Sequence, residues 1–291
     1  MHITLSHSEP APRQHGVVRT VASAIGAGVT VIVVGEAVWL SLIAAYAHSP
    51  TPFPWFVLAM ATFLAAAGAW LKWGRWPRAG AAARREGARL NAVPLRVFVL
   101  SLLAGWSSFF AGAGAYVAYR MQNGLSGEVP MTLPPGPKGA VLAGLAMAAI
   151  VAGTVEEVAV RGFMQSRLEK AYGVVPAILV SGLVWALFHS NHSYFNTSPG
   201  DVAVWFGVFL AVSAILGRIA SLTNSVLPTI VVHAGFDAAY FVSAGILQPK
   251  IAPLTYLQTL ASAQDFLTIG AGLAVLAAFC WVQLHRAVRR A

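Results

Sequence analysis

Cysteine and charge are both scarce in this chain. Cys280 is its only cysteine, which excludes an intrachain disulfide framework and a cysteine-rich zinc site. Charged residues make up 10% of the chain, against about 25% in an average soluble domain. Because 57% of the residues are hydrophobic, we expect a membrane protein rather than a soluble fold.

We expect no cleavable signal peptide at the start of this sequence. The stretch from Met1 to His15 is polar and lacks the apolar core of such a signal, so the first long apolar run is expected to act as an uncleaved insertion signal. The formal net charge of +9 does not indicate a nucleic-acid partner, because the basic residues lie between apolar runs and form no single stripe. We expect no nucleic acid to bind.

Long apolar runs recur along the whole chain, and several reach the roughly 20 residues that a helix needs to cross a bilayer. They cover residues 21–47, 53–71, 97–119, 139–160, 175–190, 201–217, 226–246 and 266–284. Backbone polar groups inside hydrocarbon must be satisfied internally, which favours helices. The sequence therefore predicts an all-α, polytopic transmembrane helical bundle of about eight helices. Residues 1–291 are expected to form a single integral membrane domain in the cell membrane.

The basic residues predict the orientation of this bundle. The loop from Lys72 to Arg96 is strongly basic, and Glu86 is its only acid. Because Lys and Arg collect in cytoplasmic loops, we place this loop and both termini in the cytoplasm. All but three of the 19 basic residues then lie on the cytoplasmic side. The exceptions are Arg120, Lys138 and Lys250, and the proline-rich stretch from Arg120 to Lys138 is expected to form an ordered outer loop.

A few ionisable residues interrupt the apolar runs. Each costs about 2.5 to 3.5 kcal/mol to insert into a membrane, which makes it a candidate for function. The set comprises Glu36, Glu156, Glu157, His189, His233 and Asp237, with Arg161 at the inner end of the fourth run. Since nothing in the sequence assigns a partner to Glu36, we interpret it as a protonated or water-facing helix-packing residue.

Helical spacing sorts these residues into pairs. Positions four apart share a face, whereas adjacent positions diverge by about 100°. Glu157 is therefore expected to pair with Arg161, while Glu156 points elsewhere and is available for chemistry. The same spacing brings His233 and Asp237 together.

The fifth run is expected to bring His189 to the same place. A hairpin that turns at Tyr172 and Gly173 would put Glu156 and His189 at about the same depth, because both lie about equally far from the turn. Three helices would then carry two histidines and two or three carboxylates to one level of the membrane.

Three short motifs in this region resemble those of the CPBP family, which includes type II CAAX prenyl endopeptidases and bacterial membrane proteins implicated in bacteriocin processing or immunity. The family's Glu-Glu-x-x-x-Arg is present at 156–161, its Phe-x-x-x-His at 185–189 and its His-x-x-x-Asn/Asp at 233–237. The chain departs from the family at Trp185, where Phe is usual. The resemblance covers about 139–246 and predicts that this segment is the catalytic core.

The resemblance implies an intramembrane endopeptidase that hydrolyses a peptide bond of a membrane-associated protein or peptide. Peptide hydrolysis needs an activated water, a group that stabilises the oxyanion and a proton for the leaving amine. We expect Glu156 to act as general base and then general acid, with His189 holding the same water. His233 and Asp237 are expected to stabilise the oxyanion, and Asp237 donates a hydrogen bond only when it is protonated.

The remaining assignments concern support, substrate and cofactor. Glu157 and Arg161 are expected to support the site as an ion pair. Trp185 and Phe188 are candidates for substrate contacts, with packing in the core as the alternative. We expect no cofactor. The alternative is a zinc enzyme in which His189, His233 and either Glu156 or Asp237 hold the metal.

Other classes of function would keep the same polar cluster. A non-catalytic membrane binding or immunity protein is one, because a fold does not imply a function. A proton-coupled transporter is another, since it would also place Glu and His inside a bundle. Hydrolysis is the preferred hypothesis because it requires Glu156, His189 and His233 at compatible depth, whereas packing does not.

Overall fold

The computed structural model describes residues 14–51, 53–124, 137–190, 199–247 and 260–290, and no strand occurs among them. The predicted all-α fold is therefore confirmed. The predictions for the N-terminal stretch and for most of the proline-rich loop fall outside the described residues. The helices are α1 (Gln14–Ala47), α2 (Trp55–Trp73), α3 (Ala81–Ala88), α4 (Leu95–Gln122), α5 (Lys138–Glu157), η1 (Val158–Met164), α6 (Gln165–Tyr172), α7 (Val174–Ser190), α8 (Pro199–Thr223), α9 (Leu227–Leu247) and α11 (Ala263–Val288).

A helix lies at each of the predicted spans. In the described part of the chain, six helices are long and apolar enough to cross a membrane, which makes this a multi-pass membrane protein. Helix α7 is shorter, with an apolar stretch from Val174 to His189. The exact count of eight spans stays a prediction.

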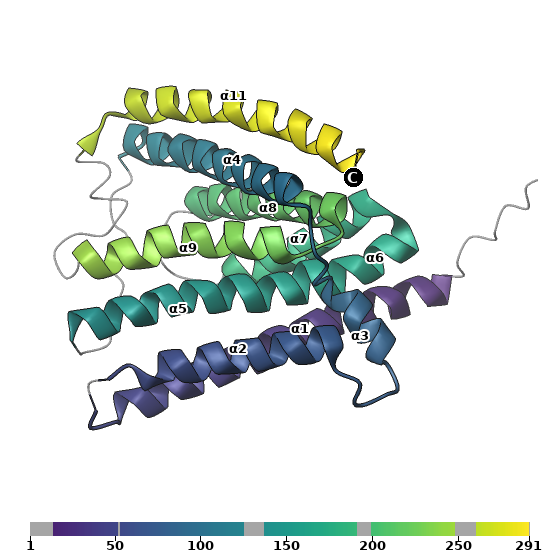
Figure 1. The fold of residues 1–291 in the computed structure, drawn as a ribbon. Helices are drawn as coiled ribbons and strands as arrows, with labels where there is room; N and C mark the ends of the chain where they lie inside the picture. Colours follow the sequence, from purple (N-terminus) through teal and green to yellow (C-terminus); the bar gives the residue numbers. More distant parts are fainter. Residues whose placement is uncertain (1–13, 52, 125–136, 191–198, 248–259, 291) are drawn as a thin grey trace, which may run out of the picture.

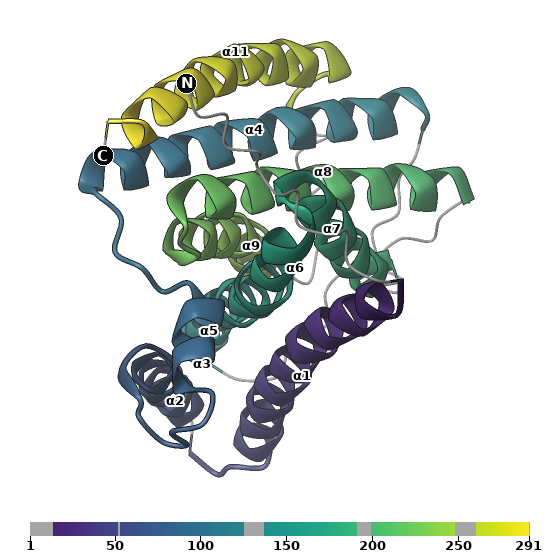
Figure 2. The same ribbon diagram turned by 90° about the vertical axis from the view of Figure 1, so that its right-hand side faces the viewer.

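The helices run up and down a single bundle (Figures 1 and 2). Helix α11 packs on α4, α5 packs on α9, and α7 packs on α8, while α1 lies along η1 and α5. The N-terminal end of α1 and the C-terminal end of α11 lie at the same end of the bundle as α3 and α6 (Figure 1). The chain thus returns to the end where it started, as an even number of spans requires.

The surface of the bundle is apolar and part of its interior is polar. Exposed fractions of 60% for Leu40, 72% for Val275 and 60% for Phe279 contrast with 0% for Glu157 and Arg161. Lipid tails solvate apolar side chains, whereas a charged group is tolerated only inside the bundle next to a partner. The distribution therefore fits a bilayer around the helices.

Helix α5 continues without a break through η1 into α6. The η1 segment is π-helical, an uncommon geometry that often occurs at functional sites. The predicted fourth span ended at residue 160, but the helical path extends to Tyr172. Gly173 follows with a φ of +81°, a left-handed backbone conformation that glycine adopts without a steric cost. The chain reverses there into α7, where the sequence predicted a turn.

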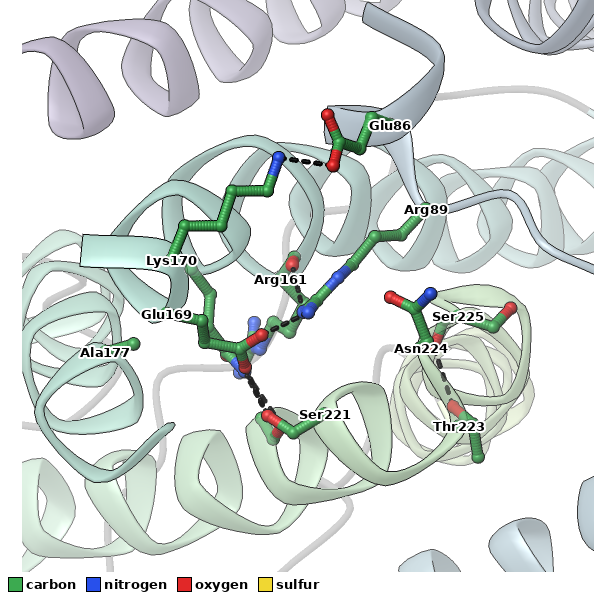
Figure 3. A network of polar contacts seen from close by, with 12 residues as sticks. Glu86, Arg89, Arg161, Glu169, Lys170, Ala177, Ser221, Thr223, Asn224 and Ser225 are labelled. Carbon is green, nitrogen blue, oxygen red and sulfur yellow. Dashed lines mark hydrogen bonds and ion pairs between the residues drawn. The ribbon is translucent and has the colours of Figure 1, made fainter. Parts of the chain in front are cut away.

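A polar network joins α3, α6, α8 and the start of α9 at one end of the bundle (Figure 3). Arg89 forms an ion pair with Glu169 of α6 and donates a hydrogen bond to the backbone oxygen of Arg161 at 3.4 Å. Ser221 of α8 donates to Glu169, and the backbone amide of Val226 donates to the carbonyl of Arg89 at 3.0 Å. The basic loop is thereby tied to the helix that carries the paired glutamates.

Candidate active site

Glu157 is the centre of a buried chain of polar contacts between three helices. Its Oε1 accepts a hydrogen bond from Arg161 at 2.9 Å and lies 2.9 Å from Nδ1 of His233 on α9. Arg161 also donates to Ser213 of α8 at 3.0 Å. The side chains of Glu157 and Arg161 are fully buried and that of His233 is 2% exposed. The ion pair between Glu157 and Arg161 that the spacing predicted is present in the structure.

Glu156 turns away from this chain, toward α7. Its Oε2 accepts a hydrogen bond from the indole Nε1 of Trp185 at 2.5 Å and lies 3.6 Å from Nε2 of His189. The side chains of Glu156 and His189 are 16% and 19% exposed, so a small molecule can reach both. The two residues that the hairpin argument placed at one depth are therefore neighbours.

The hydrogen bonds of His189 define which of its nitrogens carries the proton in the neutral ring. Its Nδ1 lies 2.9 Å from the backbone oxygen of Trp185. Because a carbonyl oxygen only accepts hydrogen bonds, Nδ1 must donate, and Nε2 then carries the lone pair of the neutral ring. That lone pair faces Glu156, which suits the binding of a water molecule between the two side chains.

Asp237 lies on the other side of His233. Its Oδ2 is 3.4 Å from Nε2 of His233, and its side chain is 18% exposed. Nδ1 of His233 is occupied by Glu157, so Glu157 and not Asp237 makes the shorter contact that orients the imidazole. Nε2 and Asp237 are the groups of this pair that remain near open space.

A cavity of about 520 Å³ connects these groups. Its lining includes the predicted catalytic residues Glu156, His189, His233 and Asp237. Most of the remaining wall is apolar, with aromatic side chains from α1, α4, α8 and α9 that include Trp39, Phe109, Tyr116, Trp205, Phe209 and Phe236. An apolar cavity with a few convergent polar groups is the usual form of a ligand site.

The two candidate substrate contacts have different surroundings. Trp185 lines the cavity, and its side chain is also part of the core, since only 1% of it is exposed. Phe188 is 42% exposed and is not among the lining residues. Trp185 therefore stays a candidate, whereas the position of Phe188 gives it no contact with this cavity.

Sequence reasoning missed three features of the site. Glu36, interpreted as a protonated or water-facing packing residue and not assigned to the site, lines the cavity. Glu157 binds His233 as well as Arg161, and Trp185 binds Glu156. The signal for Trp185 was available, because it stands where the related family has Phe and only the indole carries an N–H donor.

The described residues do not form an evident metal centre. No group of three or more His, Cys, Asp or Glu side chains in the described part of the chain is arranged to hold a metal ion. His233 directs one ring nitrogen to Glu157 and the other to Asp237, and His189 directs one to a backbone carbonyl. A histidine with one ring nitrogen on a carbonyl or carboxylate can still bind a metal through the other nitrogen, so these contacts are compatible with both the zinc hypothesis and the metal-free one.

Fold and site together define a polytopic helical membrane protein with a polar site enclosed in its bundle. Residues 138–239, which contain all three motifs, match the family model described as type II CAAX prenyl endopeptidase Rce1-like. The match confirms the resemblance to the CPBP family over this segment, which makes up less than half of the chain. No curated protein and no solved structure matched the chain.

Proposed function

We propose that the protein is an intramembrane endopeptidase that cleaves membrane-associated proteins or peptides with a water molecule activated by Glu156. The observation that carries the proposal is the division of the paired glutamates. Glu157 is fully buried and bound to Arg161 and His233, whereas Glu156 lines the cavity beside His189. One carboxylate holds the structure and the other is in reach of a substrate.

The first chemical step uses Glu156 and His189. Glu156 accepts a proton from the water while the water oxygen attacks the carbonyl carbon of the scissile peptide bond. The lone pair on Nε2 of His189 accepts the second water hydrogen and orients the attack. The result is a tetrahedral intermediate with a negative charge on the former carbonyl oxygen.

The second step uses the opposite wall of the site. In its protonated form His233 donates Nε2–H to the oxyanion, and protonated Asp237 donates a second hydrogen bond. Fixed donors of this kind contribute about 10²- to 10³-fold each to such reactions. Glu156 then gives its proton to the leaving nitrogen, so that the C–N bond breaks and a carboxylic acid and an amine are released.

The site would work within the cell membrane, with the basic loop and both termini in the cytoplasm. The family match to a CAAX prenyl endopeptidase supports a proteolytic function, and the apolar wall of the cavity suits an extended peptide with apolar side chains. The proposal extends to a protein or peptide substrate in general and does not require a prenyl group.

Glu156→Gln provides the direct test. The substitution keeps the volume of the side chain and removes the base, so hydrolysis should fall to background while the protein stays folded. Cells with the wild-type chain and cells with the variant would be compared by mass spectrometry of their membrane peptides. New peptide ends should occur only with the wild type. Identical peptide ends in both samples would contradict proteolysis by this site.

A further inference from the structure

Glu36 is an acidic residue of the cavity that the hydrolysis described above does not use. It lies on α1, outside the segment that matches the family, and its side chain lines the same cavity as Glu156 and Asp237. An ionisable group in a membrane helix is costly unless it faces a cavity or a partner. Its position in the cavity lets it contact a molecule that enters there.

Close packing between α1 and α5 places Glu36 beside the catalytic level. A Cβ atom added to Gly35 would come within 2.5 Å of Cγ1 of Val155, so the two helices approach each other closely at this point. Glu36 follows Gly35 and Glu156 follows Val155 in the sequence. The two carboxylates therefore enter the cavity from neighbouring positions on α1 and α5.

Among the described residues, Glu36 has no hydrogen-bond or ion-pair partner that neutralises it. No hydrogen bond or ion pair joins it to another residue within the described ranges, whereas Glu156 is bound by Trp185 and approached by His189. Glu36 and Glu156 do not share a proton directly, because no hydrogen bond links them. Glu36 is therefore the carboxylate of this cavity that has capacity for an external group.

The charge of the cavity favours a cation. Glu36 and Glu156 contribute two carboxylates, Asp237 is neutral in the protonated form that the hydrolysis uses, and no Lys or Arg occurs among the described lining residues. The positive charge of protonated His233 is paired with Glu157. This contrasts with the chain as a whole, whose formal net charge is +9. A carboxylate in an apolar, partly dry site attracts a cation more strongly than one in water, because the local dielectric constant is lower.

We infer that Glu36 is a specificity-determining residue that binds the Lys or Arg side chain of a peptide substrate near the scissile bond. The inference rests on the proposed function, since it identifies the substrate class for the same cavity. The apolar wall takes the neighbouring side chains of the peptide, and Glu36 forms a charge-assisted hydrogen bond to the basic one. Membrane peptides with an isolated basic residue in an apolar stretch are the expected class.

A binding experiment tests this without cleavage. The full chain in lipid nanodiscs would be titrated with a blocked apolar decapeptide that carries one central Lys, and with versions that carry norleucine or Glu there. Binding is read from the fluorescence of the tryptophans, of which Trp39, Trp185 and Trp205 line the cavity. We expect the Lys peptide to bind about tenfold more tightly than the norleucine peptide, as one hydrogen bond to a charged group predicts.

Variants at Glu36 make the result specific. Glu36→Gln should bind the Lys and norleucine peptides within about twofold of each other, and Glu36→Lys should prefer the Glu peptide. Glu86→Gln is the matched control, because Glu86 pairs with Lys170 on an exposed surface and is not among the lining residues. The control should keep the wild-type preference.

Two outcomes would overturn the inference. One is equal binding of the Lys and norleucine peptides by the wild type, and the other is an unchanged preference in Glu36→Gln. These outcomes differ from a failure of the proposed function, which would appear as identical peptide ends with the wild type and Glu156→Gln. If cleavage occurs but Lys and Arg are not enriched near the cleaved bonds, the proposed hydrolysis is supported and the role of Glu36 in specificity is contradicted.

Discussion

Glu157 shows at the scale of single residues how one buried carboxylate can organise a site. It accepts from Arg161 and contacts His233 through the same oxygen, which fixes the imidazole from the side that faces away from the cavity. An unpaired charge in such surroundings is strongly unfavourable, since neither water nor a counter-ion stabilises it. Arg161 therefore has to be present for Glu157 to remain charged and for His233 to stay in place.

Arg161→Ala should consequently reduce the yield of folded protein. The loss of a partner from a fully buried pair costs about 3 to 5 kcal/mol, and Glu157 and Arg161 are both fully buried. Yield and thermal stability in mild detergent would be compared with those of Glu156→Gln, which should fold normally. Lys170→Ala is a suitable control, because its ion pair with Glu86 is exposed and worth at most about 1 kcal/mol. Equal stability of all three variants would contradict this division between support and chemistry.

The second prediction at this scale concerns metal. His233 has a carboxylate neighbour at each ring nitrogen, and Oε2 of Glu156 accepts a hydrogen bond from Trp185, so two groups of the zinc hypothesis already have protein partners. We therefore expect cleavage to persist in a strong chelator and elemental analysis of the purified protein to find no stoichiometric zinc. A catalytic zinc enzyme would lose its activity and regain it on addition of zinc. That pattern would reassign His189 and His233 as ligands.

The pairs within one helix were predictable from sequence, and the contacts between helices were less so. Spacing of four residues indicated both Glu157 with Arg161 and His233 with Asp237, which the structure contains. The contact between Glu157 and His233 depends on how α5 and α9 are rotated about their axes, which a sequence period does not define. The position of Glu36 in the cavity depends in the same way on the packing of α1 against α5.

At the scale of elements, the contact between α5 and α9 determines the geometry of the site. A Cβ atom at Gly153 would lie 2.8 Å from the backbone nitrogen of Ala234 and 2.9 Å from the backbone oxygen of Ile230. Both neighbours are backbone atoms, so they cannot rotate away as a side chain could. Only glycine allows the two helices to come this close, one turn before Glu157 and directly beside His233.

Gly153→Ala should therefore push α9 away from α5 and lengthen the hydrogen bond between Glu157 and His233. Overpacking of this kind costs about 1 to 3 kcal/mol, which a stable bundle tolerates, but a displacement of about 1 Å at a catalytic group costs about 10²-fold in rate. Cleavage by the folded variant would be measured beside that of Gly139→Ala, since a Cβ at Gly139 meets no atom within 4 Å. Full activity of Gly153→Ala would show that the close approach has no role in catalysis.

The path of the helices was predicted in outline, but one element was not. All predicted spans coincide with helices, and the turn after α6 lies at Gly173. The π-helical segment η1 has no marker in the sequence, because its residues are ordinary apolar ones around Arg161. Its geometry follows from contacts with α1, α3 and α5, which are tertiary in origin.

At the scale of the whole molecule, the orientation in the membrane is the main open prediction. The described chain begins and ends at the same end of the bundle, where α3 and α6 also lie (Figure 1). The positive-inside rule places that end in the cytoplasm. A reporter fused at Arg84 should be active on the cytoplasmic side, and one fused at Gly124 should be active outside. The reverse pattern would overturn this orientation, and with it the assignment of each loop to the cytoplasmic or the outer side of the membrane.

The cavity is built from two stretches of the chain with different properties. The groups proposed for chemistry all lie within residues 138–239, the part that matches the family, while α1 and α4 contribute part of the remaining lining. Mutations in the first two fifths of the chain can therefore reshape what fits next to the scissile bond and leave the hydrolytic groups in place. Such a division lets a lineage acquire new substrates by gradual drift in one stretch while selection maintains the other.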